Sequence, residues 1–254
     1  MRFGMLNDVT RCTGCRSCQV ACKQWNDRKA EETKNLGSYE NPFNLSGNTW
    51  KRVKFVEKEE GDYAKWSFFS YQCNHCGDAG CMAVCPANAI KRSRNGAVYI
   101  DEKICTGCKY CLQACPFHIP HTDEEKKVSS KCTFCVDRIS NGLPPACAKA
   151  CPTGAIVFGS RDYVLAVARE RASILAERGE KKFTMYGENI LGGLGVIYLL
   201  PDSPEVYGLP EKPKNPPAVN FVNVFSNSFV SLIVALLITI GAYASFKKED
   251  KDAR

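Results

Sequence analysis

The apolar positions of the chain form two unlike parts, a long front part of short apolar runs and one long apolar run near the carboxyl end. In the front part, Asn95-Gly96 separates two short apolar runs, which is the pattern of a β-hairpin. The later run GAIVFG, residues 154–159, repeats the same kind of element. From Ser160 to a stop at Gly179, apolar residues recur at helical spacing and predict an amphipathic packing helix; they are Val164, Leu165, Ala168, Ala172 and Leu175.

The carboxyl-terminal run predicts a membrane span. Pro201–Pro217 holds six prolines and predicts an extended, semi-rigid connector. In the following stretch, Val224–Phe246, the final 18 residues carry no charge. As a helix they would extend about 27 Å, close to the thickness of a bilayer core. A buried helix of a soluble protein is the alternative, but the charged stop KKEDKDAR favours a single transmembrane helix.

The charges around this run predict its orientation. Four Lys and Arg residues follow the span, whereas only Lys212 and Lys214 lie in the roughly 20 residues before it. The positive-inside rule therefore puts the tail in the cytoplasm and the domain before the span outside. The first 25 residues contain no apolar signal region and no twin arginine. We therefore expect export in the folded state, together with a partner subunit that carries a signal.

One further segment and the net charge of the chain say less about function. Residues 26–65 form a polar insertion without a ligand-like cluster, which fits either surface loops or a partner-binding surface. The formal charge of +7 is spread along the chain, so nothing resembles the basic stripe of a nucleic-acid-binding protein.

Cysteine content changes the picture of the front part, because 16 of the 254 residues are cysteines. They form four sets of four, and none is left over as a free nucleophile. The sets are Cys12, Cys15, Cys18 and Cys22; Cys73, Cys76, Cys81 and Cys85; Cys105, Cys108, Cys111 and Cys115; and Cys132, Cys135, Cys147 and Cys151.

The spacing of these sets predicts iron–sulfur clusters. The first and third sets read C-x2-C-x2-C-x3-C, the spacing of two-cluster bacterial ferredoxins, in which the fourth cysteine ligates the other cluster. A disulfide framework would scatter its cysteines over a shorter chain. A zinc site would favour two separated C-x2-C knuckles, which only the fourth set faintly resembles. All sixteen cysteines are therefore candidate metal ligands of 4Fe–4S clusters.

The fold class that follows is α+β, with two ferredoxin-like double-cluster subdomains in one chain and a carboxyl-terminal transmembrane helix. Gly14 and Gly107 supply the positive φ that the ligand loops need. Such a core has few apolar residues, so cluster ligation is expected to supply much of the folding free energy.

Other titratable residues near the sets have a weaker claim. His75 lies between Cys73 and Cys76, but four thiolates are already available, so a packing role is expected; His118 and His121 have no better claim to ligation. Lys109 and Lys149 stand beside ligands and could raise a local potential, although exposed lysines are usually only solvated. No acid–base or nucleophilic group stands apart from the ligands, which indicates a non-catalytic electron-transfer subunit.

Several motifs carry a resemblance to a known family. CQVACKQWND, YENPFNLSGNTW, CTFCVDRISNGLPPACAKACPTGAIVFG and GVIYLLPDSPEVYGLP resemble the four-cluster iron–sulfur β subunits of molybdopterin oxidoreductases. The chain is most similar to the membrane-anchored β subunit of respiratory formate dehydrogenase. This resemblance implies electron transfer from a pterin-containing catalytic α subunit to a membrane cytochrome b γ subunit and then to quinone. A membrane-bound hydrogenase or another molybdopterin oxidoreductase is the alternative complex.

The resemblance also implies which cysteines share a cluster and where the subunit works. Quartets one and four form the pair that faces the catalytic subunit, and quartets two and three form the pair on the membrane side. The heterotrimer is expected to form a higher-order oligomer in the cell membrane, with the clusters on the periplasmic side. The four implied ligand sets are Cys12, Cys15, Cys18 and Cys151; Cys132, Cys135, Cys147 and Cys22; Cys73, Cys76, Cys81 and Cys115; and Cys105, Cys108, Cys111 and Cys85.

The expected domain organisation follows from these assignments. Residues 1–160 form the cluster domain, in which 1–29 with 121–160 make one subdomain, 66–120 make the other, and 30–65 are an insertion. After it come a helix and packing segment at 161–200, the connector at 201–223, the span at 224–246 and a charged tail at 247–254.

Overall fold

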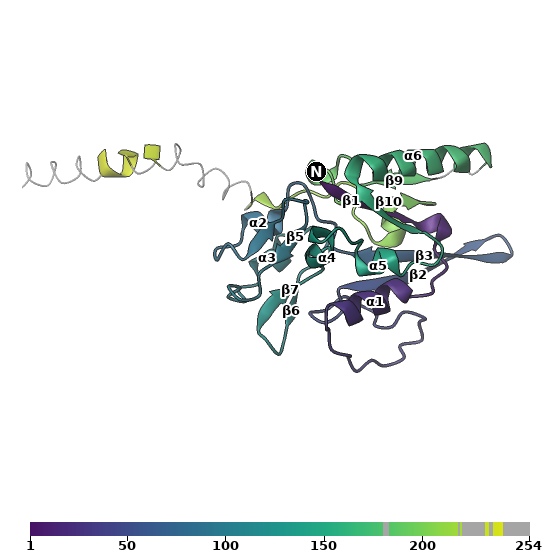
Figure 1. Cartoon of the computed structure of the whole chain (residues 1–254), viewed down its shortest axis with the longest axis horizontal. Coiled ribbons are helices and arrows are strands. Elements are labelled where there is room, and N and C mark those ends of the chain that lie inside the picture. Colours follow the sequence, from purple (N-terminus) through teal and green to yellow (C-terminus); the bar gives the residue numbers. More distant parts are fainter. Residues whose placement is uncertain (180–182, 218, 220–231, 234–235, 241–254) are drawn as a thin grey trace, which may run out of the picture. The chain divides into compact units, whose positions relative to one another are not determined.

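A computed structural model of the chain describes residues 1–179, 183–217, 219, 232–233 and 236–240. Its largest sheet has four strands in the order β8 (Ile156–Ser160), β1 (Phe3–Asp8), β10 (Val196–Leu200) and β9 (Thr184–Tyr186). β1 pairs antiparallel with β8 and parallel with β10, and β10 pairs antiparallel with β9. Three segments far apart in the chain thus meet in one sheet (Figure 1).

The two faces of this sheet bury different side chains. Leu6, Ile197 and Leu199 pack against the helix α6 (Arg161–Glu177). The alternate positions, among them Met5 and Tyr198, belong to the larger core that contains cysteines. This alternation follows from the period of two along a strand.

The predicted packing helix is confirmed. α6 begins after Ser160, whose hydroxyl accepts a hydrogen bond from the Tyr163 N–H at 3.2 Å, and Gly179 beyond its end has a φ of 80°. Segment 161–200 does not form a separate layer, however, because its strands β9 and β10 complete the same sheet as β1. Pairing β10 beside β1 buries both apolar strands, which neither could achieve alone.

In the part of the chain that the structure describes, three hairpins make up the remaining strands. β2 (Lys51–Glu60) pairs with β3 (Tyr63–Gln72) over their whole length, so residues 51–65 of the polar insertion belong to a long hairpin that the sequence pattern did not indicate. β4 (Ile90–Arg92) pairs with β5 (Val98–Ile100), which confirms the hairpin predicted around Asn95-Gly96. The other hairpin joins β6 (His121–Asp123) to β7 (Val128–Ser130). The run GAIVFG forms a strand, but in the four-stranded sheet and not in a hairpin.

The described residues also form five short helices, which together carry five of the cysteines. They are α1 (Ser17–Trp25), α2 (Gly80–Ala83), α3 (Tyr110–Gln113), α4 (Val136–Ser140) and α5 (Ala146–Lys149), with 3₁₀ turns η1 (Val9–Arg11), η2 (Ile190–Gly192) and η3 (Pro204–Tyr207). Gly14 and Gly107 both have a φ of 69°, as their place in the ligand loops predicts. Each is followed two positions later by a second left-handed residue, Arg16 or Lys109, at the start of α1 or α3.

The first part of the proline-rich segment packs against the domain and is not a free connector. The side chains of Tyr207 and Leu209 are each 1% exposed. The Lys54 ammonium donates to the Tyr207 carbonyl at 2.9 Å, and the Tyr186 hydroxyl donates to the Pro210 carbonyl at 2.7 Å. Burial of the apolar Tyr207 and Leu209 side chains, which lie between the prolines, stabilises this packed position relative to an extended segment in water.

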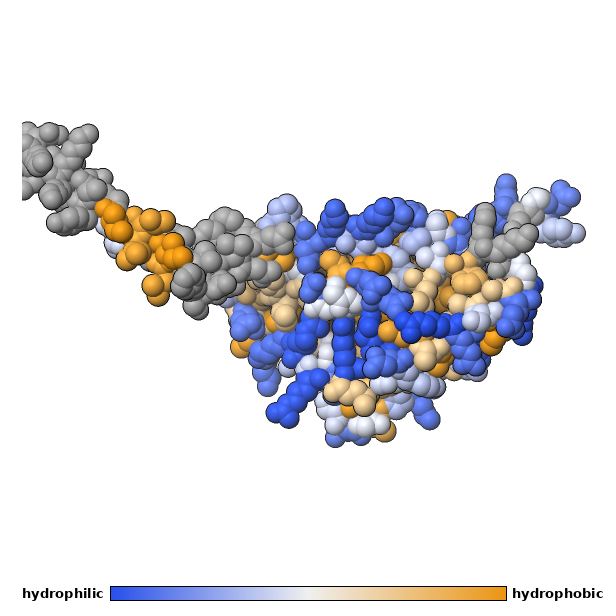
Figure 2. Space-filling view, turned by 90° about the horizontal axis from the view of Figure 1, so that it is seen from above, coloured by the Kyte–Doolittle hydropathy of each residue, from blue (hydrophilic) through white to orange (hydrophobic). Residues whose placement is uncertain are grey.

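The chain divides into two compact units, residues 1–215 and 216–254. Much of the predicted span, 224–231, 234–235 and 241–246, and all of the tail lie outside the described residues. Among the residues described, no helix has the length and apolar character needed to cross a membrane. Residues 232–233 and 236–240 are helical and expose six large apolar side chains, which form an apolar surface (Figure 2); they are Leu232, Ile233, Leu236, Leu237, Ile238 and Ile240.

Candidate iron–sulfur cluster sites

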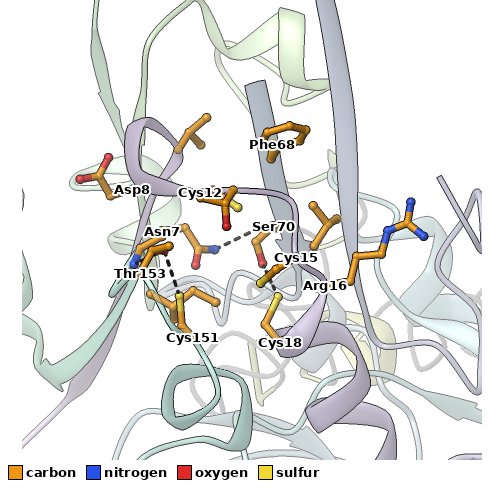
Figure 3. Close-up of a pocket in the computed structure, with 15 residues that line it drawn as sticks. Asn7, Asp8, Cys12, Cys15, Arg16, Cys18, Phe68, Ser70, Cys151 and Thr153 are labelled. Carbon is orange, nitrogen blue, oxygen red and sulfur yellow. Dashed lines mark hydrogen bonds between the residues drawn. The ribbon is translucent and has the colours of Figure 1, made fainter. Parts of the chain in front are cut away.

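The first cavity gathers four cysteines from the two ends of the cluster domain. Cys12, Cys15 and Cys18 come from the loop and helix after β1, and Cys151 comes from the loop before β8, more than a hundred residues later. They surround a partly open cavity of about 410 Å³ (Figure 3). Cys22, which shares their motif, does not line it.

Cys22 instead lines a second cavity, of about 290 Å³, together with Cys132, Cys135 and Cys147. Helix geometry explains the division. Cys18 and Cys22 lie one turn apart on α1, so their sulfurs sit on the same face but at different heights along the helix. The face of α1 packs against α5, which carries Cys147.

The remaining eight cysteines form two more groups. Cys85, Cys105, Cys108 and Cys111 line a cavity of about 290 Å³. The other four interact with one another: burial raises the pKa of Cys76, and the nearby Cys73, Cys115 and Cys81 thiols raise it further. None of the sixteen cysteines forms a disulfide bond.

The four groups lie in a row. Burial raises the pKa of Cys18, and Cys147 of the second group adds to the shift. Burial raises the pKa of Cys132 as well, with Cys73 of the third group as its next cause. Burial raises the pKa of Cys81 to about 12, and Cys111 of the last group contributes. Neighbouring groups are therefore close enough for their charges to interact.

Backbone and side-chain groups are directed at the sulfurs. The Ala89 N–H donates to Cys85 Sγ at 3.3 Å, the Ser129 N–H to Cys105 Sγ at 3.4 Å and the Phe134 N–H to Cys132 Sγ at 3.4 Å. Ser70 Oγ lies 3.7 Å from Cys18 Sγ, and Ser129 Oγ lies 3.3 Å from Cys111 Sγ. The backbone N–H donors stabilise negative charge on sulfur.

These observations fit iron–sulfur clusters. Within the described residues, no three His, Cys, Asp or Glu side chains are arranged to hold a single metal ion; the cysteines line cavities instead. Burial and mutual repulsion disfavour a set of bare thiolates, and a positively charged occupant would stabilise them. An iron–sulfur core supplies that charge and accepts or releases one electron at a time.

Two lysines that the sequence reasoning did not single out lie inside this core. Lys51 is 2% exposed and Lys131 is 3% exposed. Burial alone would lower the pKa of the Lys51 ammonium, but the thiolates of Cys147, Cys18 and Cys22 outweigh it and raise the pKa. Lys51 begins β2 two positions before the buried Val53, so the period of two along a strand could have indicated an inward position.

The lysines and the histidine that stand beside ligands in the sequence differ in burial. Lys109 and Lys149 are exposed. His75 is buried: its Nδ1 accepts from the Val98 N–H at 3.1 Å, and its ring lies 4.5 Å from that of Phe134, centroid to centroid. Burial lowers its pKa well below the ordinary value, which keeps the ring neutral. These contacts fit the packing role expected for His75.

Comparison with known proteins identifies the kind of site. Two family models, both described as a 4Fe-4S dicluster domain, match residues 11–89 and 64–161. The "Formate dehydrogenase-O iron-sulfur subunit" of Escherichia coli is 43% identical over 220 residues, which are 85% of this chain and 73% of the relative. The "Formate dehydrogenase, nitrate-inducible, iron-sulfur subunit" of the same organism is 44% identical over 213 residues, 82% of this chain and 72% of the relative.

A third relative matches over nearly its whole length. The "Formate dehydrogenase 2 subunit beta (cytochrome c-553)" of Nitratidesulfovibrio vulgaris is 41% identical over 216 residues, which are 82% of this chain and 97% of the relative. The dicluster domains and the cysteines assign 4Fe–4S clusters and an electron-transfer role to this chain. The chain belongs to the family of formate dehydrogenase iron–sulfur subunits.

Proposed function

We propose that this chain relays electrons through four 4Fe–4S clusters between the pterin-containing catalytic subunit of a formate dehydrogenase and a membrane cytochrome b that serves quinone. The observation that carries this proposal is the row of four cysteine groups, each next to the following one. Electron transfer makes and breaks no bonds, so the chain's task is to hold the groups close together and away from water. Most of the cysteine thiols are buried or half-buried, as this task requires.

The ligand sets proposed are those with thiols near one another. The row begins with Cys12, Cys15, Cys18 and Cys151, followed by Cys22, Cys132, Cys135 and Cys147; then come Cys73, Cys76, Cys81 and Cys115, and last Cys85, Cys105, Cys108 and Cys111. We propose the first end of the row for the catalytic subunit and the last end for the membrane side. The N–H and hydroxyl groups around the sulfurs would raise the reduction potentials, since reduction adds negative charge.

We further propose that the carboxyl-terminal run anchors the chain in the cell membrane, with its tail in the cytoplasm. The uncharged run from Phe229 to Phe246 and the exposed apolar side chains of its described part support this. A c-type cytochrome is a second candidate for the electron acceptor, because the name of the Nitratidesulfovibrio relative includes cytochrome c-553. The assembled complex is proposed to be a higher-order oligomer of the heterotrimer.

Purification of the full chain from membranes tests the function. We expect it to co-purify with a large pterin protein that has formate dehydrogenase activity and with a haem b protein. The iron and acid-labile sulfide contents should each approach about sixteen per chain. A haem c protein in place of haem b would favour the second acceptor. Zinc without sulfide, or a nickel–iron subunit in place of the pterin protein, would contradict the proposal.

A further inference from the structure

Lys51 lies at the junction between the first two cysteine groups. It lines the second cavity with Cys22 and Cys147, and its ammonium also interacts with Cys18 of the first group. The ammonium donates a hydrogen bond to the side-chain carbonyl oxygen of Gln72, its partner across the β2–β3 hairpin. The side chain is thereby held in place between the two groups.

Lys131 occupies the corresponding place at the next junction. It directly precedes Cys132 of the second group, and its ammonium donates to the Cys132 carbonyl at 3.1 Å and to the Val98 carbonyl. The same ammonium interacts with Cys73 and Cys81 of the third group. It therefore faces two adjacent groups, as Lys51 does.

Neither lysine is neutralised by an acidic side chain. Within the described part of the chain, no Asp or Glu oxygen lies within 4.0 Å of either ammonium, and the hydrogen-bond partners are a neutral amide and neutral carbonyls. Burying an unpaired ammonium is strongly unfavourable. Among the described residues, the negative groups that act on these two ammonium groups are the cysteine sulfurs. A cubane held by four thiolates carries a net negative charge.

We propose that Lys51 and Lys131 are shared counter-charges, each of which stabilises an added electron on both of the cluster sites that it faces. This inference rests on the proposed electron-transfer function and deepens it. An ammonium at a junction acts on both sides, so it raises both potentials and keeps them close together. Electrons can then pass the junction in either direction without a large uphill step. Water does not screen these charges, because both side chains are buried.

Redox titration of the purified complex, followed by electron paramagnetic resonance, tests this. Lys51→Met should lower the potentials of the first and second sites at least tenfold in the one-electron equilibrium constant, or about 59 mV. Lys131→Met should lower those of the second and third sites by a similar factor. The fourth site, held by Cys85, Cys105, Cys108 and Cys111, should keep its potential in both variants.

Matched variants separate charge from packing. Lys51→Arg keeps the charge and should leave the potentials near those of the parent, whereas Lys51→Gln keeps a hydrogen-bonding group without the charge and should behave as Lys51→Met does. Lys109→Met and Lys149→Met remove exposed charges beside ligands and should shift no potential measurably, because water screens them. If Lys51→Met loses iron, the potentials of Lys51→Gln and Lys51→Arg are compared instead. Lower potentials in Lys51→Gln alone would then support the inference, and equal potentials would contradict it.

Three results would overturn the inference while leaving the proposed function intact. They are unchanged potentials in the fully iron-loaded Lys51→Met and Lys131→Met variants, a shift confined to one of the two adjacent sites, and an equal shift in Lys109→Met. A parent complex without iron and sulfide would instead remove the proposed function itself. Thermal unfolding of each variant, followed by circular dichroism, provides the control for folding.

Discussion

Cys22 lies one helical turn after Cys18, yet the two sulfurs line different cavities. Its environment is almost wholly protein: burial raises the pKa of its thiol well above the ordinary value, and Cys132 and Cys147 raise it further. The Asn26 side-chain amide donates to its sulfur at 3.7 Å. Cys22 thus connects the first motif of the chain to a group made by the last motif.

We predict that Cys22→Ser damages the second site, because serine removes one of its four thiolates. The iron content should fall by up to about four atoms per chain, and the spectroscopic signal of the site held by Cys132, Cys135 and Cys147 should change first. Cys15→Ser is the matched control, and it should affect the first site instead. Loss of only the first site in Cys22→Ser would contradict the proposed ligand sets.

Tyr198 is a buried titratable residue beside the ligand loop that holds Cys73 and Cys76. Its hydroxyl donates to the Asn74 side-chain oxygen at 2.8 Å, and its ring centroid lies 5.0 Å from that of Phe69. Burial raises its pKa well above the ordinary value, and Tyr71 adds to the shift. The folded state therefore keeps its proton at a pH where the unfolded chain has lost it.

The sign of the resulting pH dependence follows from linkage. The stability associated with protonated Tyr198 is fully present below about pH 10, the value in the unfolded chain, and is lost as the pH rises above it. The loss is up to about 1.4 kcal/mol per pH unit. Thermal unfolding between about pH 9 and 11 should show a shallower decline for Tyr198→Phe than for the parent. Equal slopes would show that Tyr198 does not contribute; Tyr71 and Tyr186 shift in the same direction and account for a remaining slope.

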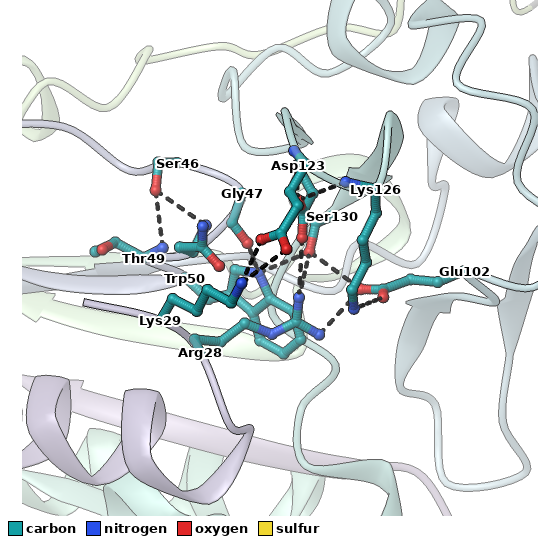
Figure 4. A network of polar contacts seen from close by, with 12 residues as sticks. Arg28, Lys29, Ser46, Gly47, Thr49, Trp50, Glu102, Asp123, Lys126 and Ser130 are labelled. Carbon is teal, nitrogen blue, oxygen red and sulfur yellow. Dashed lines mark hydrogen bonds and ion pairs between the residues drawn. The ribbon is translucent and has the colours of Figure 1, made fainter. Parts of the chain in front are cut away.

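At the scale of elements, Arg28 joins the end of α1 to the β6–β7 hairpin and to the turn after β5 (Figure 4). Its guanidinium lies 3.0 Å from Glu102 Oε1 and 3.7 Å from Asp123 Oδ2. It also lies over the Trp50 ring, 4.0 Å from the centroid. The Trp50 indole N–H in turn can donate to Gly47 O and Ser130 Oγ, both at 2.9 Å.

We predict that Arg28→Met lowers the free energy of unfolding by about 3 kcal/mol, because it leaves the buried Asp123 carboxylate without its ion partner. Denaturant unfolding of the full chain measures this. Lys29→Met is a matched control at the neighbouring position, since Lys29 pairs with Glu125 on the exposed surface. It should have no measurable effect. Similar losses in both variants would contradict a special role for the buried pair.

At the scale of the whole molecule, the four-stranded sheet pairs the amino-terminal strand β1 with strands that come more than 140 residues later in the sequence. β1, β8 and β10 come from residues 3–8, 156–160 and 196–200, and the sheet places the loop with Cys12 beside the loop with Cys151. The helix α6 covers the sheet face that points away from the cysteines. The first cavity therefore depends on strand pairing as well as on its loops.

Removal of residues 218–254 tests the proposed anchor. We expect the full chain to stay with the membranes after alkaline carbonate extraction and the shortened chain to be released, because the uncharged run is lost. Leu236→Arg should weaken retention, since a charge within the bilayer core costs roughly 3 kcal/mol. Removal of 247–254 alone is the control and should leave retention unchanged. Release of the full chain would refute the anchor.

The sequence by itself predicted the kind of cofactor and the helix from Ser160, because both depend on local spacing or periodicity, whereas the pairing of the cysteine motifs followed from the resemblance to a known family. It did not indicate the β2–β3 hairpin, whose strands mix charged and apolar residues, or the docking of Tyr207 among prolines. The strand partner of a segment and the burial of a polar side chain depend on segments that are distant in the sequence, so local sequence does not determine them. Only the tertiary structure placed Lys51 and Lys131 inside the core, because burial depends on distant segments that fold around a residue.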